Sequence, residues 1–80
     1  MTILEKIKEN NPDAIIWDDL DDAIIGCTSE YVAVYDIDKL YECLLKNNPE
    51  WYEQDALEWV DFNILGAYVG EFTPIHIFTK

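Results

Sequence analysis

Four aspartates within five residues form the densest group of ionisable side chains in the sequence. They are Asp18, Asp19, Asp21 and Asp22. Carboxylates are oxygen ligands of the kind that Ca²⁺ and Mg²⁺ prefer. A calcium-binding EF-hand loop does not fit, because counting from Asp19 puts Ala23 at the fifth position and Ile24 where glycine is needed. The stretch therefore predicts a solvated acidic turn and no metal site.

Cys27, Cys43 and His76 are the residues that suggest zinc binding or nucleophilic catalysis. None stands in a close pair, so zinc-ligand spacing is absent. Both cysteines lie within apolar patterns, where buried thiols are usually inert. His76 lies between Ile75 and Ile77 in a β-prone run, so we expect it on the opposite face, toward solvent. The three glycines are isolated and form no phosphate-binding loop. We predict a non-enzymatic protein without a cofactor.

The charge balance excludes several classes of partner. Seventeen Asp and Glu face five Lys and no Arg, which gives a net charge of −12. Bidentate phosphate and guanine contacts are made mostly by Arg, so direct nucleic-acid binding is not expected. Attachment to an anionic membrane is not expected for the same reason. A basic protein surface remains the natural partner for such a chain.

The most informative acidic pattern lies on the third expected helix, residues 49–65. Its wet side carries Glu50, Gln54, Glu58 and Asp61. Successive members lie about 6 Å apart along a helix axis. Duplex DNA presents one charge per ~1.7 Å, so this helix would imitate DNA only together with another element such as the acidic turn. Trp51 would be an exposed anchor beside the stripe; the alternative is an ordinary solvated helix face.

The order of elements predicts an α+β fold in a single domain over residues 1–80. We expect helices over residues 2–10, 37–46 and 49–65, the last capped by Asn48 with Pro49 at its first position. Strands are expected over residues 14–17, 23–27, 31–35 and 73–78. The predicted order is α-β-β-β-α-α-β, with a mostly antiparallel sheet packed against the helices.

Three local features sharpen this expectation. Thr2 and Glu5 have capping-box spacing, and Asp36 is suited to cap the second helix. Residues 28–30 suit a three-residue hairpin loop. The run over residues 23–27 is nearly all apolar, which predicts a strand buried on both faces. The charged start of the chain and the lack of a long apolar run predict a cytoplasmic protein.

Several segments together resemble a known group of proteins. They are DAIIG at residues 22–26, AVYD at 33–36, ALE at 56–58, FNILGAYVGE at 62–71 and TPI at 73–75. The pattern is similar to short, mostly uncharacterised acidic proteins of tailed bacteriophages, over roughly the last three-quarters of the chain. The FNxxGAYVGExTP stretch is its most specific part. Members often have a longer segment between the two central strands, and the resemblance brings no catalytic residues.

This resemblance implies a protein that acts in the cytoplasm of a host cell. Small acidic phage proteins often inhibit host nucleic-acid-binding or defence proteins by covering a basic surface. The expected contact residues are Asp18, Asp19, Asp21, Asp22, Glu50, Trp51, Glu58 and Asp61. Two alternatives stay open: an accessory protein whose acidity serves solubility, and a homo-oligomer that sequesters a small molecule.

Overall fold

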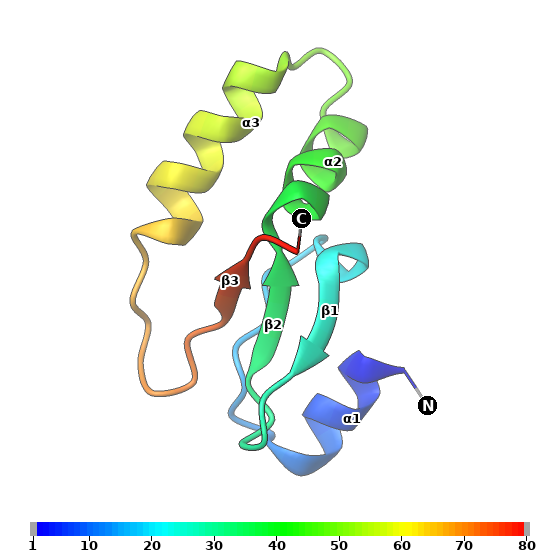
Figure 1. Cartoon of the computed structure of the whole chain (residues 1–80), viewed down its shortest axis with the longest axis vertical. Helices are drawn as coiled ribbons and strands as arrows, with labels where there is room; N and C mark the ends of the chain where they lie inside the picture. The colour runs from blue at the N-terminus through cyan, green and yellow to red at the C-terminus, as the bar shows by residue number, and fades with distance from the viewer. Residues whose placement is uncertain (1, 80) are drawn as a thin grey trace.

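The computed structural model describes residues 2–79 and has the expected α+β class. In chain order the elements are α1 (Ile3–Asn10), a 3₁₀ turn (Asp21–Ala23), β1 (Ile24–Cys27), β2 (Ala33–Asp36), α2 (Ile37–Asn47), α3 (Glu53–Val60), a π-helical turn (Asp61–Leu65) and β3 (Ile75–Ile77) (Figure 1). The strand order in the sheet is β1-β2-β3. β1 pairs antiparallel with β2, whereas β3 pairs parallel with β2. The sheet is therefore mixed rather than mostly antiparallel, because β3 reaches β2 through the α2–α3 crossover.

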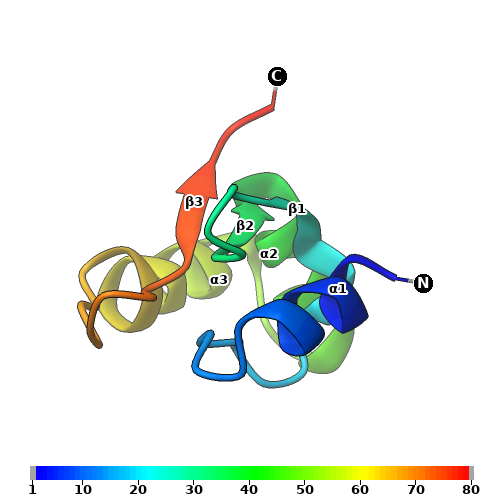
Figure 2. The same cartoon turned by 90° about the horizontal axis from the view of Figure 1, so that it is seen from below.

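The helices α1 and α3 lie on one side of the sheet, and the other side carries no helix in the described chain (Figure 2). Tyr35, in the central strand, points to the covered side and is fully buried. On the open side, Val34 lies beside Ile75, and a Cβ placed on Gly26 would meet no atom within 4 Å. The core is thus one-sided, built from β2, the helices and the segment before β1.

Helix α2 forms as its apolar spacing predicts. Ile37, Leu40 and Leu44 are buried, and Tyr41 and Leu45 are half-buried on the same stripe. Its first turn is capped by Asp36, because the Asp36 Oδ2 atom accepts the Lys39 N–H at 3.3 Å. The other oxygen, Oδ1, accepts the Thr79 hydroxyl at 3.2 Å. One buried carboxylate therefore caps α2 and holds the chain after β3.

Of the expected capping box of α1, the N-cap bond to Thr2 is confirmed, whereas the Glu5 carboxylate accepts the Thr2 hydroxyl and not the Thr2 backbone N–H. The Glu5 N–H donates to the Thr2 hydroxyl oxygen at 3.1 Å, and the Thr2 hydroxyl donates to the Glu5 carboxylate at 3.2 Å. Ile7 is fully buried and is the residue by which α1 joins the core.

The expected strand over residues 14–17 is not formed. This segment is irregular, and its Trp17 N–H donates to the Tyr35 hydroxyl rather than to a neighbouring strand. The prediction that β1 is buried on both faces is also wrong, since all four of its residues are half-buried. β1 is an edge strand of a sheet with one open face, and neither property is visible in an apolar run.

The hairpin between β1 and β2 has a longer loop than residues 28–30. The Thr28 N–H donates to the Val32 carbonyl at 3.0 Å, and the Tyr31 N–H donates to the Thr28 carbonyl at 2.9 Å. Tyr31 takes the left-handed conformation, with φ of 63°, that glycine usually supplies in such loops. The Thr28 hydroxyl oxygen accepts two further backbone N–H groups, from Glu30 and Val32, which supports this tight turn.

The third helix begins at Glu53 and not at Pro49. Residues 48–52 form a turn in which the Trp51 N–H donates to the Asn48 carbonyl. In this turn Trp51 packs partly against the core, where its large indole buries apolar surface. Tyr52, four residues before the buried Ala56, is 81% exposed.

The double role of Asp36 gives a stability prediction. Replacing Asp36 by Ala removes both hydrogen bonds, and we expect the free energy of unfolding to fall by about 1–2 kcal/mol. Asp36→Asn keeps an oxygen acceptor for the cap, so its free energy of unfolding should fall by less. Urea denaturation of both variants measures this difference. Asp38→Ala, an exposed acidic residue in the same helical turn, is the control, and an equal loss in that control would contradict the assignment.

Candidate functional site

The one histidine takes part in an aromatic cluster at the centre of the fold. Its Nε2 atom accepts the Trp17 Nε1–H at 2.9 Å. Its ring stacks against Trp17 and Tyr35, with centroids 6.1 Å and 5.9 Å away. The expectation that His76 faces solvent is wrong, because β3 turns His76 to the covered side and leaves Ile75 and Ile77 43% and 39% exposed. The hydrogen bond from Trp17 holds His76 on the covered side, and the two isoleucines that flank it in β3 therefore lie on the open side.

The ionisable side chains of this cluster, His76 and Tyr35, are held in their neutral forms, and each accepts a hydrogen bond from Trp17. Burial lowers the pKa of His76, which favours the neutral imidazole whose Nε2 accepts the hydrogen bond from Trp17. Burial also raises the pKa of Tyr35 to about 12. The backbone N–H that Trp17 donates to its hydroxyl lowers the pKa, but by less. Cys43 is buried, and burial together with Asp22 raises its pKa, so its thiol stays protonated at neutral pH. The arrangement fits a structural role for all of these groups.

The acidic turn lies against the end of α2. Asp19, Asp21 and Asp22 line a recess of about 230 Å³. Asn47 Nδ2 donates to the Asp19 carbonyl at 3.1 Å, which ties the turn to the last residue of α2. Within residues 2–79, no three His, Cys, Asp or Glu side chains converge in the way that a metal ion requires.

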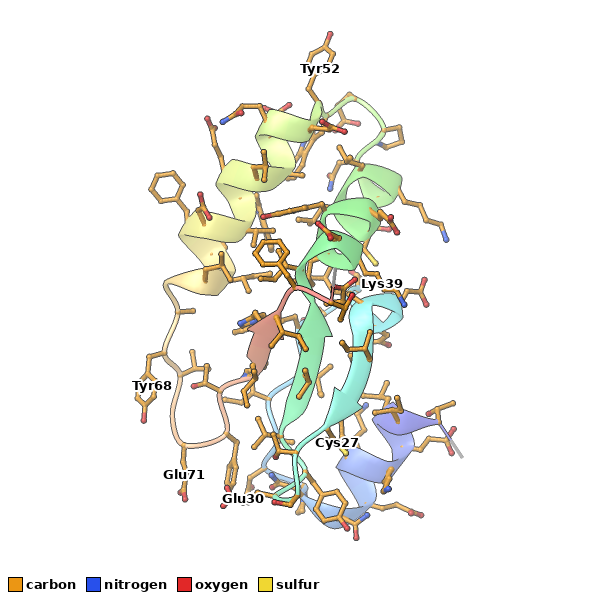
Figure 3. The ribbon with its side chains drawn as sticks, viewed as in Figure 1. Cys27, Glu30, Lys39, Tyr52, Tyr68 and Glu71 are labelled. Atoms are coloured by element: carbon orange, nitrogen blue, oxygen red, sulfur yellow. The ribbon has the colours of Figure 1, made fainter. Side chains whose placement is uncertain are left out.

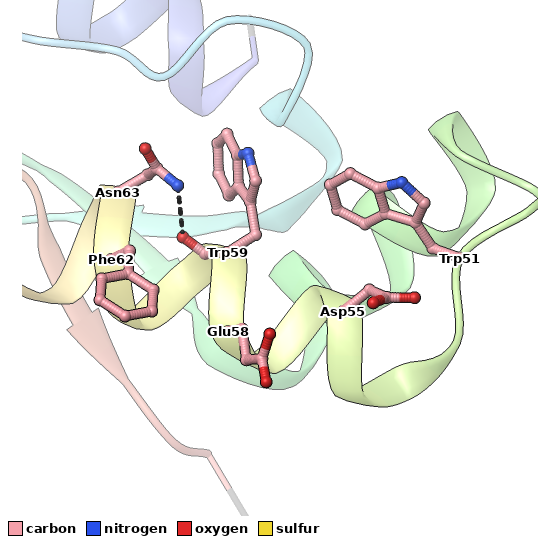
Figure 4. Close-up of a pocket in the computed structure, with 6 residues that line it drawn as sticks. All are labelled: Trp51, Asp55, Glu58, Trp59, Phe62 and Asn63. Carbon is pink, nitrogen blue, oxygen red and sulfur yellow. Dashed lines mark hydrogen bonds between the residues drawn. The ribbon is translucent and has the colours of Figure 1, made fainter.

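An open groove of about 410 Å³ runs along α3 (Figure 4). Its lining residues are Trp51, Asp55, Glu58, Trp59, Phe62 and Asn63. The five from Asp55 to Asn63 follow the helical spacing i, i+3, i+4, i+7 and i+8, and Trp51 precedes them in the turn before α3. Trp51 and Trp59 extend to the same side of the helix, Asp55 lies beneath the Trp51 ring, and Glu58 and Phe62 lie along the other margin. The groove therefore combines three aromatic rings with two carboxylates.

Two of the predicted contact residues, Trp51 and Glu58, lie together in this groove. Glu50 and Asp61 are exposed but do not line it. Asp61 acts on the pKa of Tyr41 in α2, which is raised first by burial and then by Asp61, so Asp61 lies toward the α2 side. The expected stripe thus divides between two sides of α3.

Asp55, Trp59 and Phe62 were missed as site residues. Trp59 reads as part of the apolar side of the helix, and it is in fact half-buried against the core. The available signal was the four-residue spacing from Trp51 through Asp55 to Trp59. Asn63 has a structural role, since its Nδ2 donates to the Trp59 carbonyl at 3.0 Å (Figure 4).

Several aromatic side chains at separate places are strongly exposed. Phe62 and Tyr68 are 83% and 81% exposed, and Phe78 is 61% exposed after β3. The side chains of Tyr52 and Tyr68 point away from the ribbon (Figure 3). The molecule therefore exposes aromatic side chains as well as acidic ones.

The chain has no match among protein families, curated proteins or solved structures. In the described residues, no helix has the length and apolar character needed to cross a membrane.

The bond between Trp17 and His76 gives a pH prediction. The folded-state pKa of His76 lies below its unfolded value, so the unfolded chain binds the proton more readily. The stability that this group contributes is therefore complete above the unfolded pKa, near 6.5, and is lost as the pH falls below it. Thermal unfolding of the native protein should become easier between pH 7 and pH 5.

His76→Gln is the matched control, because its amide oxygen can accept the Trp17 N–H without titrating in this range. The difference in melting temperature between the native protein and this variant should change as the pH falls. The Trp17 indole N–H resonance should shift with the same midpoint in the native protein alone. A pH-independent difference between the two proteins would contradict the role given to this bond.

Proposed function

We propose that this protein binds a basic surface of another protein and acts without catalysis. The observation that carries the proposal is the α3 groove, where the carboxylates of Asp55 and Glu58 lie among three aromatic side chains. Aromatic anchors in a charged surround are typical of residues that dominate protein–protein binding. The partner that fits best is a host nucleic-acid-binding or defence protein, as the resemblance to acidic phage proteins suggests.

The distribution of charge supports a basic partner. No Lys or Arg occurs from Asn47 to Thr79, while six Asp and Glu do. Four of these six, Glu50, Glu53, Asp55 and Glu58, lie in the turn before α3 or within α3. The bond from Asn47 to Asp19 joins the acidic turn to the last residue of α2, the end from which the chain continues to α3. Such a field would speed the encounter with a positive surface and make binding sensitive to salt.

The first experiment is capture from a bacterial lysate with tagged protein at low and at raised salt. We expect an identifiable nucleic-acid-binding or defence protein to be retained at low salt and released at high salt. Glu58→Lys with Asp55→Lys should reduce its retention at least roughly tenfold, because each change places like charges together at the groove. Duplex DNA should compete with the tagged protein for the captured partner.

The matched control is Glu9→Lys with Asp13→Lys, which changes the net charge equally at the far end of α1. Retention should change little in this control beyond the general effect of net charge. Recovery of the chain alone, or of the same proteins with both double variants, would contradict the proposal. Self-association in that experiment would instead favour a homo-oligomer.

A further inference from the structure

We infer that the α3 groove binds an arginine side chain of the partner, an inference that rests on the proposed function and specifies the chemistry of its site. The groove offers two indole rings, from Trp51 and Trp59, and the carboxylate of Asp55 next to the Trp51 ring (Figure 4). Phe62 and Glu58 complete its other margin. A ligand in this position would meet aromatic faces and negative charge together.

Aromatic faces attract cations through the negative potential above the ring, and indole is the strongest of the natural rings in this respect. A guanidinium group suits these walls better than an ammonium group. It is planar, it stacks on aromatic rings, and it is more weakly hydrated than the ammonium group of lysine. Its fork of N–H donors also matches a carboxylate at two points.

The two carboxylates of the groove retain capacity for such a ligand. Asp55 uses Oδ2 to accept the Tyr52 N–H at 2.8 Å, and Glu58 uses Oε1 to accept the Gln54 side-chain N–H at 3.2 Å. Among residues 2–79, the second oxygen of each carboxylate accepts no side-chain or backbone hydrogen bond. Both bonds also hold the carboxylates in position along the first turns of α3.

The occupant cannot come from a second copy of this chain, because the sequence contains no arginine. The absence of Lys and Arg between Asn47 and Thr79 further means that no cation of this segment offsets the groove. An arginine of a basic partner surface supplies the missing charge. Surfaces that bind nucleic acids are rich in this residue, which agrees with the partner class proposed above.

The test uses the whole protein, labelled with ¹⁵N, and two nine-residue peptides that differ only in having four arginines or four lysines. The indole N–H resonances of the three tryptophans are followed during titration. Those of Trp51 and Trp59 should shift with the arginine peptide. That of Trp17 should stay, because its N–H is held by His76 inside the core. The lysine peptide should bind about threefold to fivefold more weakly.

Matched variants locate the contact on α3. Glu58→Gln removes a groove charge, whereas Glu53→Gln removes a charge on the same helix that lines a different recess, toward α2. The first should weaken binding of the arginine peptide about threefold or more, and the second should weaken it less. Phe62→Ala removes an exposed ring without disturbing the core and should also weaken binding.

Equal binding of the two peptides, equal effects of Glu58→Gln and Glu53→Gln, or shifts confined to residues outside the groove would overturn the inference. If the arginine peptide fails to bind while a basic partner is still captured in a salt-sensitive way, the groove assignment falls and the proposed function stands. If the peptide binds the groove but no basic partner is captured, the groove assignment stands and the proposed function falls.

Discussion

The buried hydroxyl of Tyr35 joins parts of the chain that are far apart in sequence. Its oxygen accepts the Trp17 N–H at 2.9 Å, and its ring stacks on His76 of β3. The Trp17 indole N–H then closes the triangle by donating to His76. The irregular segment before β1 and the last strand are therefore positioned by one side chain of the central strand. Because a raised pKa keeps this hydroxyl protonated, the cluster carries no charge from it at neutral pH.

This arrangement leaves α3 with one side against the core and another free to form a surface. Ala56, Val60 and Ile64 are buried, so they fix the helix to the rest of the molecule. The π-helical turn that follows α3 changes the periodicity, and Phe62 is exposed while Ile64 remains inside. Turns of this kind occur frequently at functional sites. Here the turn extends the aromatic groove beyond the end of the regular helix.

The acidity of the molecule has a cost that the fold does not remove. A net charge of −12 on 80 residues destabilises the compact state through self-repulsion. The lysines of the described chain lie on α1 and α2, and Lys39 and Lys46 share a recess with Asp22 of the acidic turn, so α3 alone carries its negative charges without a basic residue of its own. A basic partner would relieve this repulsion on binding, which couples the charge of the surface to its proposed role.

The sequence by itself determined the α+β class, the caps at Thr2 and Asp36 and the buried stripe of α2. These depend on residues within a few positions of one another. It also placed Glu58 on the wet side of the third helix, where the structure has it exposed, because helical spacing is local. Only the tertiary structure decided that residues 14–17 form no strand, that β3 runs parallel to β2 and that His76 faces inward. Each of these depends on hydrogen bonds between distant residues, and such partners leave no periodic signal in a single chain.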